Sequence, residues 1–149
     1  MKSAVFAQVL MGLVALVSGA AYCPPRPATT SEQLAILDEF IQKFYVHHNV
    51  SGAFNDHADV NWIEHDPNGL SGRQNAIDGL SGFIPMTNQT IMHRGVSDNI
   101  GYIHFREDMP GSPTTVDMDI IRFNGTCMME HWDVSQAKSP NATNPLAYW

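Results

Sequence analysis

The sequence predicts an α+β fold in which helices come first and an antiparallel sheet follows. Leu34, Leu37, Ile41 and Phe44 recur at helical spacing in the first half of the chain. The second half alternates apolar and polar residues in four stretches, separated by short turns such as Asn124-Gly125. Because helices precede a run of strands, we expect them to pack on one face of the sheet.

The first residues have the pattern of a secretory signal peptide. A short basic start precedes an apolar run at residues 4–17, and small residues follow that run. The run is short for a membrane span, and polar, proline-rich sequence comes after it. We therefore expect residues 1–20 to be removed by cleavage after Ala20 or Ala21. A secreted mature chain of about 128 residues would remain, with no membrane anchor.

Sequons and cysteines agree with an extracellular location. Four Asn-X-Ser/Thr sequons predict glycosylation, at Asn49, Asn88, Asn124 and Asn141. The chain has two cysteines, Cys23 and Cys127. In an oxidising compartment they form one disulfide between the N-terminal region and the last hairpin; otherwise they remain two unpaired thiols.

The charge distribution narrows the classes of partner. The formal net charge is −7 at pH 7, and the lysines and arginines are scattered singly along the chain. Nucleic acids and anionic membrane surfaces are therefore poor partners. The sequence also has no GxSxG elbow and no glycine-rich phosphate loop.

The predicted elements divide the chain into an arm, a domain and a tail. Thr29 or Thr30 is a candidate N-cap for a helix of about 18 residues, with Glu32 or Gln33 completing a capping box. We expect an extended, proline-rich arm at residues 21–30, one domain at residues 31–136 and an irregular tail at residues 137–149. Within the domain we expect helices near residues 31–48, 51–57 and 72–84, and strands near residues 60–67, 89–98, 100–108, 114–123 and 126–135.

The last hairpin carries many ionisable and aromatic residues on its sides. A two-residue turn at Asn124-Gly125 predicts a register in which Asp119 pairs with Glu130. One face would then carry Asp117, Asp119, Ile121, Phe123, Met128, Glu130 and Trp132. If this face lines a cavity, adjacent carboxyl groups of low solvation suit proton transfer. If it is open to water, the acids are ordinary surface groups.

Three histidines are candidates for chemistry. His104 shares a strand face with Tyr102, and His65 ends an earlier strand. His131 falls on the opposite face from Asp119 in the simple register. It is therefore either structural, for instance in a subunit interface, or re-aimed by a β-bulge. The histidines lack the tight spacing of a metal motif, so a metal-dependent hydrolase is a third hypothesis behind two metal-free ones.

Two motifs resemble those of the SnoaL-like polyketide cyclases, a branch of the nuclear-transport-factor-two-like superfamily. "NWIEHDPNGLSGRQNAIDGLSGF" resembles the block "YIQHNP…dG…f..f", and "VDMDIIRFNGTCMMEHWDVSQ" resembles the closing signature that ends in "EHWDVxQ". The tail "NPLAYW" is also similar, so the resemblance covers about residues 31–149. It implies a cone-shaped, strongly curved antiparallel sheet, or cystatin-like α+β barrel, covered by N-terminal helices with a pocket at its open end.

The resemblance also implies roles for individual residues. Asp119 would be the acid–base group of an aldol-type ring closure without metal or organic cofactor, and His104 would assist it. His65 matches a histidine of the first motif and would polarise a carbonyl. Which of Asp117 and Asp119 acts remains open, because both lie on the same face. The expected substrate contacts are Trp132, Tyr102, Phe123, Ile121, Asp117 and Glu130.

Two functions from different classes follow. The first is a secreted, cofactor-independent lyase, isomerase or cyclase acting on a small carbonyl-containing molecule. The second is a binding module in which the same pocket holds a small molecule without chemistry. In both cases the partner is a small molecule, and we expect a homodimer through the outer sheet face that carries Met118, Ile120 and Met129.

Overall fold

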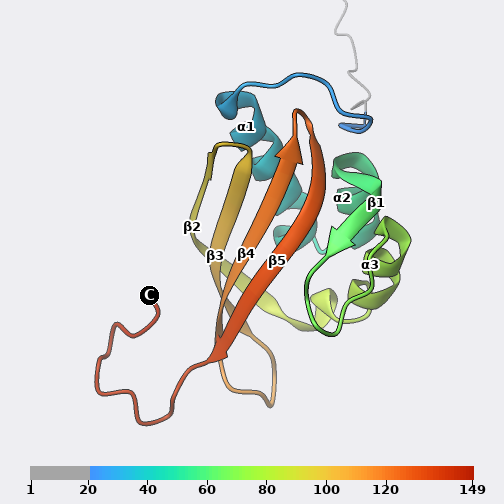
Figure 1. Cartoon of the computed structure of the whole chain (residues 1–149). Helices are drawn as coiled ribbons and strands as arrows, with labels where there is room; N and C mark the ends of the chain where they lie inside the picture. Colours follow the sequence, from blue (N-terminus) through green and yellow to red (C-terminus); the bar gives the residue numbers. More distant parts are fainter. Residues whose placement is uncertain (1–20) are drawn as a thin grey trace, which may run out of the picture.

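Helices and a five-stranded sheet make up the computed structural model, which describes residues 21–149 (Figure 1). The predicted signal peptide at residues 1–20 lies outside the described residues. The helices are α1 (Thr30–Ile41), the π-helix η1 (Gln42–Val46), α2 (Val50–His57), α3 (Arg73–Leu80) and the 3-10 helix η2 (Ile84–Met86). The strands are β1 (Ala58–Glu64), β2 (Asn88–Ser97), β3 (Ile100–Asp108), β4 (Thr115–Asn124) and β5 (Cys127–Ala137).

The α+β class is confirmed, with helices packed on one face of a curved sheet (Figure 1). The strand order is β1-β5-β4-β3-β2, and the pairs from β2 to β5 are antiparallel as expected. One pairing differs from the prediction, because β1 lies parallel to β5. The sheet is open rather than a closed barrel, since β1 and β2 form its two edges. None of the helices among residues 21–149 is long and apolar enough to cross a membrane.

The first helix begins at the predicted capping box. The Thr29 hydroxyl accepts a hydrogen bond from the Glu32 amide, and the Glu32 carboxylate accepts one from the Thr29 amide. The predicted single long helix is interrupted, because α1 gives way to the π-helix η1 at Gln42. This wider turn allows two successive side chains, Phe44 and Tyr45, to be buried together.

The register of the last hairpin differs from the prediction. Asn124 pairs with Cys127 and Phe123 with Met128, but Arg122 pairs with Glu130, so β5 carries a bulge. The extra residue on β5 reverses which face each later residue occupies. His131 therefore pairs with Ile121 on the inner face, and Glu130 lies on the outer face.

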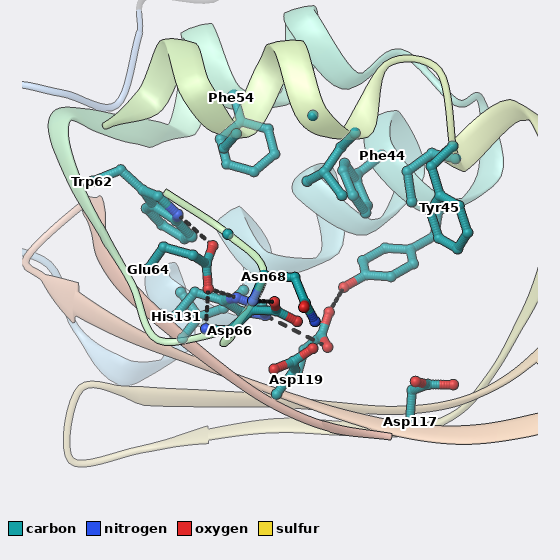
Figure 2. A pocket seen from close by; sticks show the side chains of 18 of the residues that line it. Phe44, Tyr45, Phe54, Trp62, Glu64, Asp66, Asn68, Asp117, Asp119 and His131 are labelled. Carbon is teal, nitrogen blue, oxygen red and sulfur yellow. Dashed lines mark hydrogen bonds and ion pairs between the residues drawn. The ribbon is translucent and has the colours of Figure 1, made fainter. Parts of the chain in front are cut away.

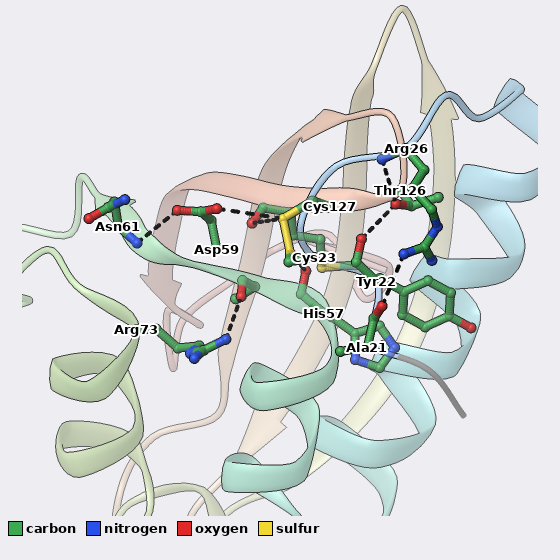
Figure 3. Close-up of a disulfide and its surroundings, with 12 residues drawn as sticks. Ala21, Tyr22, Cys23, Arg26, His57, Asp59, Asn61, Arg73, Thr126 and Cys127 are labelled. Carbon is green, nitrogen blue, oxygen red and sulfur yellow. Dashed lines mark hydrogen bonds between the residues drawn. A yellow bond between two sulfur atoms is a disulfide. The ribbon is translucent and has the colours of Figure 1, made fainter. Parts of the chain in front are cut away.

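A disulfide between Cys23 and Cys127 ties the N-terminal arm to the start of β5 (Figure 3). Hydrogen bonds hold the arm beside the same turn: the Thr126 hydroxyl donates to the Tyr22 carbonyl at 2.6 Å, and the Thr126 amide donates to the Arg26 carbonyl at 2.9 Å. Of the two states that the sequence left open for the cysteines, the structure has the bonded one.

Candidate functional site

A cavity of about 500 Å³ lies between the helices and the inner face of the sheet. Side chains from α1, η1, α2 and α3 line one side of it, and side chains from β1, β3, β4 and β5 line the other. Figure 2 shows Phe44 and Phe54 on the side opposite Asp117 and Asp119. A volume of this size accommodates a small organic molecule. The residues used below that line it are Phe44, Tyr45, Phe54, Trp62, Glu64, Asp66, Phe83, Phe105, Glu107, Asp117, Asp119, Ile121, His131 and Asp133.

Aromatic rings supply most of the apolar wall. Phe44 contacts Phe54 edge-on with ring centroids 5.8 Å apart, and Tyr45 contacts Phe105 edge-on at 5.1 Å. These rings are almost completely buried, so their positions are fixed by the core as well as by the cavity. The wall is therefore rigid and preformed.

A chain of polar contacts crosses the floor of the cavity (Figure 2). The Tyr45 hydroxyl donates a short hydrogen bond to Asp119 Oδ2. Asp119 Oδ1 lies 3.5 Å from His131 Nε2, and His131 Nδ1 lies 2.7 Å from Glu64 Oε1. The Trp62 indole N–H donates to the other Glu64 oxygen at 3.1 Å. Each side chain is thus oriented by its neighbour in the chain.

The backbone explains why these side chains meet. Asp119 and Ile121 alternate with outward residues on β4, which places both on the inner face. Glu64 pairs with His131 across the parallel β1–β5 contact, so the carboxylate and imidazole extend side by side. Tyr45 comes from η1 on the opposite side of the cavity.

The two carboxylates decide the charge of His131. Burial disfavours an imidazolium, but hydrogen bonds and charge from Asp119 and Glu64 outweigh burial and raise the pKa of His131 to about 10. His131 is therefore cationic at neutral pH. Burial, followed by the negative charge of Asp119, raises the pKa of Tyr45 well above its ordinary value, so its hydroxyl stays a hydrogen-bond donor.

Three further acids of the cavity have raised pKa values, whereas a carboxylate paired with a cation has a lowered one. Burial is the largest cause of the raised pKa values of Glu107 and Asp117, and nearby carboxylates add to it. Burial and the charge of Asp66 raise the pKa of Asp133 to about 6. Burial and the charge of neighbouring carboxylates therefore both disfavour the ionised forms of these three acids.

Three of the predicted site residues line the cavity: Asp119, Asp117 and Ile121. Phe123 lies on the same strand face but is 2% exposed and packs in the core. Asp119 is hydrogen-bonded to Tyr45 and faces His131, whereas Asp117 accepts a hydrogen bond from the Thr115 hydroxyl at 2.7 Å. Both acids line the cavity, and they differ in their hydrogen-bond partners.

The expected positions of His65, Trp132 and Glu130 need correction. The bulge in β5 turns Trp132 and Glu130 to the outer face. There the His65 ring stacks on Trp132 at 4.7 Å, and its Nε2 lies 2.8 Å from Glu130 Oε1. Glu130 also accepts a hydrogen bond from Arg122 at 2.5 Å. The structure does not bring these three side chains to the cavity.

His104 and Tyr102 also lie on the outer face, contrary to expectation. Strand alternation is the reason, because Ile103 and Phe105 of β3 face the core and are 0% and 6% exposed. The His104 ring stacks on His93 with the two Nδ1 atoms 3.0 Å apart. His104 is therefore separated from Asp119 by the sheet.

Sequence reasoning left the position of His131 open and did not single out Glu64, Tyr45 or Trp62. The simple register places His131 on the face opposite Asp119, and the β-bulge, one of the two alternatives that the sequence left open, brings it to the face of Asp119. Glu64 required knowledge of the parallel β1–β5 pairing. Tyr45 required the π-helix, since a regular α-helix with Phe44 in its apolar stripe turns the next residue away by about 100°. The alternation "MEHWD" in β5 gave no local sign of the bulge.

Comparisons with known proteins give a likeness in structure alone. No protein-family model and no curated protein matches the sequence. An NTF2-like protein of unknown function from Burkholderia xenovorans LB400 matches with TM-score 0.65 and 13% identity, covering 74% of this chain and 89% of that chain.

Two further solved structures carry functional names. A "putative polyketide cyclase" from Acidithiobacillus ferrooxidans matches with TM-score 0.58 and 16% identity, over 73% of this chain and 91% of that one. A "putative ketosteroid isomerase" from Kribbella flavida matches with TM-score 0.63 and 10% identity, over 76% of this chain and 84% of that one. The likenesses show that this chain has the nuclear-transport-factor-two-like fold.

Proposed function

We propose that the chain is a secreted, cofactor-independent enzyme that moves a proton on a small carbonyl-containing molecule, as a lyase, isomerase or aldol-type cyclase. One observation carries the proposal: the Asp119 carboxylate stands between a neutral hydroxyl donor and an imidazolium at the floor of an aromatic cavity. Such a site combines a base with donors that stabilise an enolate. The functional names of the two solved structures above support the same class.

In the first step, Asp119 removes a proton from a carbon next to the substrate carbonyl. The C–H electron pair becomes the enolate π bond, and the negative charge moves to the carbonyl oxygen. The Tyr45 hydroxyl and the His131 Nε2–H, which point to Asp119 in the free protein, are the available donors to that oxygen. The apolar wall lowers the polarity around these groups, which strengthens their electrostatic interactions.

In the second step, the enolate is either protonated again or forms a new carbon–carbon bond. An isomerase returns the proton from Asp119 to a different carbon. A cyclase instead lets the enolate carbon attack a second carbonyl, and Asp119 gives its proton to the new alkoxide. Glu64 holds His131 in place through both steps without contacting the substrate. Glu64 is therefore a positioning residue.

Exchange of carbon-bound hydrogen tests the proposal without knowledge of the natural substrate. The probe is 4-phenylbutan-2-one in deuterated buffer, with loss of the proton signals next to the carbonyl followed by NMR. Asp119→Asn should slow exchange by at least about 100-fold, the contribution of a general base. Asp98→Asn is the matched control, because Asp98 lies exposed at the β2–β3 turn. If wild type and Asp119→Asn exchange hydrogen at the same rate, Asp119 is not the base and the proposed mechanism is wrong.

One observation favours the binding module as the second candidate. Both Asp119 oxygens already have partners in the free protein, as expected of a structural polar network. A pure binding module would retain affinity for 4-phenylbutan-2-one within a few-fold in Asp119→Asn and would show no exchange in wild type. Calorimetric titration beside the NMR assay separates the two functions.

Export and glycosylation belong to the same proposal. The four sequon asparagines, Asn49, Asn88, Asn124 and Asn141, are all exposed. Asn49 also caps α2, since its side-chain oxygen accepts a hydrogen bond from the Gly52 amide at 2.9 Å. Intact mass measured before and after enzymatic deglycosylation reports how many of the sites carry glycan.

A further inference from the structure

We propose that the cavity selects a small organic cation: an amine whose ammonium group lies against the carboxylates of the sheet and whose apolar body lies against the aromatic wall. The inference rests on the proposed function only in taking this cavity as the ligand site. It adds the charge of the ligand, which the acid–base mechanism leaves open. Where the ligand is also the substrate, the carbonyl and the amine belong to one molecule.

The charge balance of the lining is the first observation. Among the described residues the lining includes one cation, His131, and no lysine or arginine. Two of the lining carboxylates, on Asp119 and Glu64, already neutralise that cation. Six acids line the cavity, and they come from β1, the loop after it, β3, β4 and β5. They are Glu64, Asp66, Glu107, Asp117, Asp119 and Asp133.

The second observation is the lack of cationic partners. No ion pair among residues 21–149 involves Glu107, Asp117 or Asp133. Glu107 accepts a hydrogen bond from the Gln89 amide at 3.1 Å, and Asp117 one from Thr115. These neutral donors offset the loss of water only in part. The raised pKa values of the three acids agree with unbalanced negative charge in the cavity.

The aromatic wall suits the same ligand. Aromatic faces attract organic cations as well as apolar groups, most strongly where water is excluded. Phe44 and Phe54 line the cavity from the helices and Phe105 lines it from β3. Phe83, which is 37% exposed, also lines it. An amine with a phenyl-sized body would meet acids at one end and rings at the other.

The spacing of the acids favours an organic cation over a metal ion. A compact ion needs several donor atoms that converge on one point. Among the described residues, the three potential ligand atoms within 4.8 Å of one another belong to Cys23, Asp59 and Cys127, and the two sulfurs form the disulfide. The cavity acids are instead spread over β1, the loop after it, β3, β4 and β5. A spread of negative charge stabilises a cation without chelating it.

Three probes of equal shape and different charge test the inference. 3-Phenylpropylamine is cationic, 3-phenylpropan-1-ol is neutral and 3-phenylpropionate is anionic at pH 7.5. Binding is measured by calorimetric titration of the full mature chain. The amine should bind at least about tenfold more tightly than the alcohol, and the anion should bind most weakly.

Paired variants show whether the unpartnered acids cause the preference. The double variant Glu107→Gln/Asp117→Asn should reduce the amine-to-alcohol ratio to below about threefold. The alcohol should bind within about twofold of wild type, which shows that the cavity is intact. Asp78→Asn/Asp98→Asn removes the same net charge from exposed positions and should leave the ratio unchanged.

The outcomes separate this inference from the proposed function. Equal binding of the three probes, or a preference that survives in Glu107→Gln/Asp117→Asn, would overturn the cation inference. Proton exchange on the neutral ketone that depends on Asp119 would then still support the enzyme. If no probe of any charge binds and no exchange occurs, the cavity is not a ligand site and both proposals fall.

Discussion

Asp119 has two neighbours of opposite character, and each affects its carboxylate differently. Tyr45 is a neutral donor held by the core, and His131 is a cation held by Glu64. A neutral donor can transfer its hydrogen bond to a substrate oxygen without leaving a charge unpaired. A cation stabilises the carboxylate throughout and the enolate once it forms.

Removal of the Tyr45 hydroxyl tests the neutral donor. Tyr45→Phe keeps the ring contacts with Phe105, so the cavity wall should remain. Loss of one hydrogen bond to a charged group should slow ketone exchange about 10-fold to 100-fold. Tyr102→Phe is the matched control, because Tyr102 is 41% exposed on the outer face. Equal rates in the two variants would show that Tyr45 has no part in the chemistry.

The charge of His131 predicts a pH dependence of stability. Its pKa is raised from 6.5 in the unfolded chain to about 10 in the folded one. The stabilisation is therefore complete below about pH 6.5 and is lost as the pH rises towards about 10. For one proton the loss is at most about 1.4 kcal/mol per pH unit.

Urea unfolding of wild type and His131→Gln at pH 6, 7.5 and 9 measures this dependence. The difference in unfolding free energy should be largest at pH 6 and should shrink at each higher pH. Other groups that titrate in this range affect both proteins and cancel in the difference. A difference that stays constant from pH 6 to 9 would contradict a cationic His131.

At the scale of single elements, alternation within one strand was predictable and register between strands was not. The inner face of β4 follows from the sequence pattern, so Asp117, Asp119 and Ile121 were found. The bulge in β5 adds one residue to the hairpin, and the alternation of the strand does not say whether such a residue is present. One extra residue was enough to exchange Glu130 and Trp132 for His131 at the site.

The turn between β4 and β5 is where the arm and the hairpin meet. Gly125 has φ of 53°, and a Cβ atom placed there would lie 1.9 Å from the Arg26 carbonyl oxygen. Gly125→Ala should therefore move the arm and weaken its hydrogen bonds to Thr126. We expect a loss of about 2–4 kcal/mol in unfolding free energy.

Gly111→Ala is the matched control for this change. Gly111 also has a positive φ, 80°, but no atom lies within 4 Å of a Cβ placed there. It should lose only about 1 kcal/mol from backbone strain. Equal losses in the two variants, measured by urea unfolding, would show that contact with the arm contributes nothing.

At the scale of the whole molecule, the order of elements predicted the fold class and the placement of helices on one face. The parallel position of β1 was not predictable in the same way. β1 lies far from β5 in the sequence, and its alternation fits either direction. The bulge, which the sequence left as one of two alternatives, and the parallel edge, which it did not suggest, are the two features that bring His131 and Glu64 to Asp119.

The outer face of the sheet carries the side chains that the site does not use. Val134 is 67% exposed and Tyr102 41%, and Met118 lines a shallow depression beside Val134. Apolar groups exposed together on a sheet favour association. The expected homodimer should therefore use this face, which leaves both cavities open on the opposite sides of the two sheets.

Sedimentation velocity of wild type and two charge variants tests the homodimer. Val134→Glu places a charge on the outer face of β5, beside Met118, and should convert a dimer into a monomer, because an unpaired charge in an apolar interface is costly. Val46→Glu changes an equally apolar residue, 51% exposed, on the helical side and should leave the dimer intact. A wild-type protein that sediments as a monomer at about 100 μM would contradict the dimer. The contacts that join Tyr45, Asp119, His131 and Glu64 all lie within one chain. The monomeric Val134→Glu variant should therefore still catalyse hydrogen exchange on the ketone.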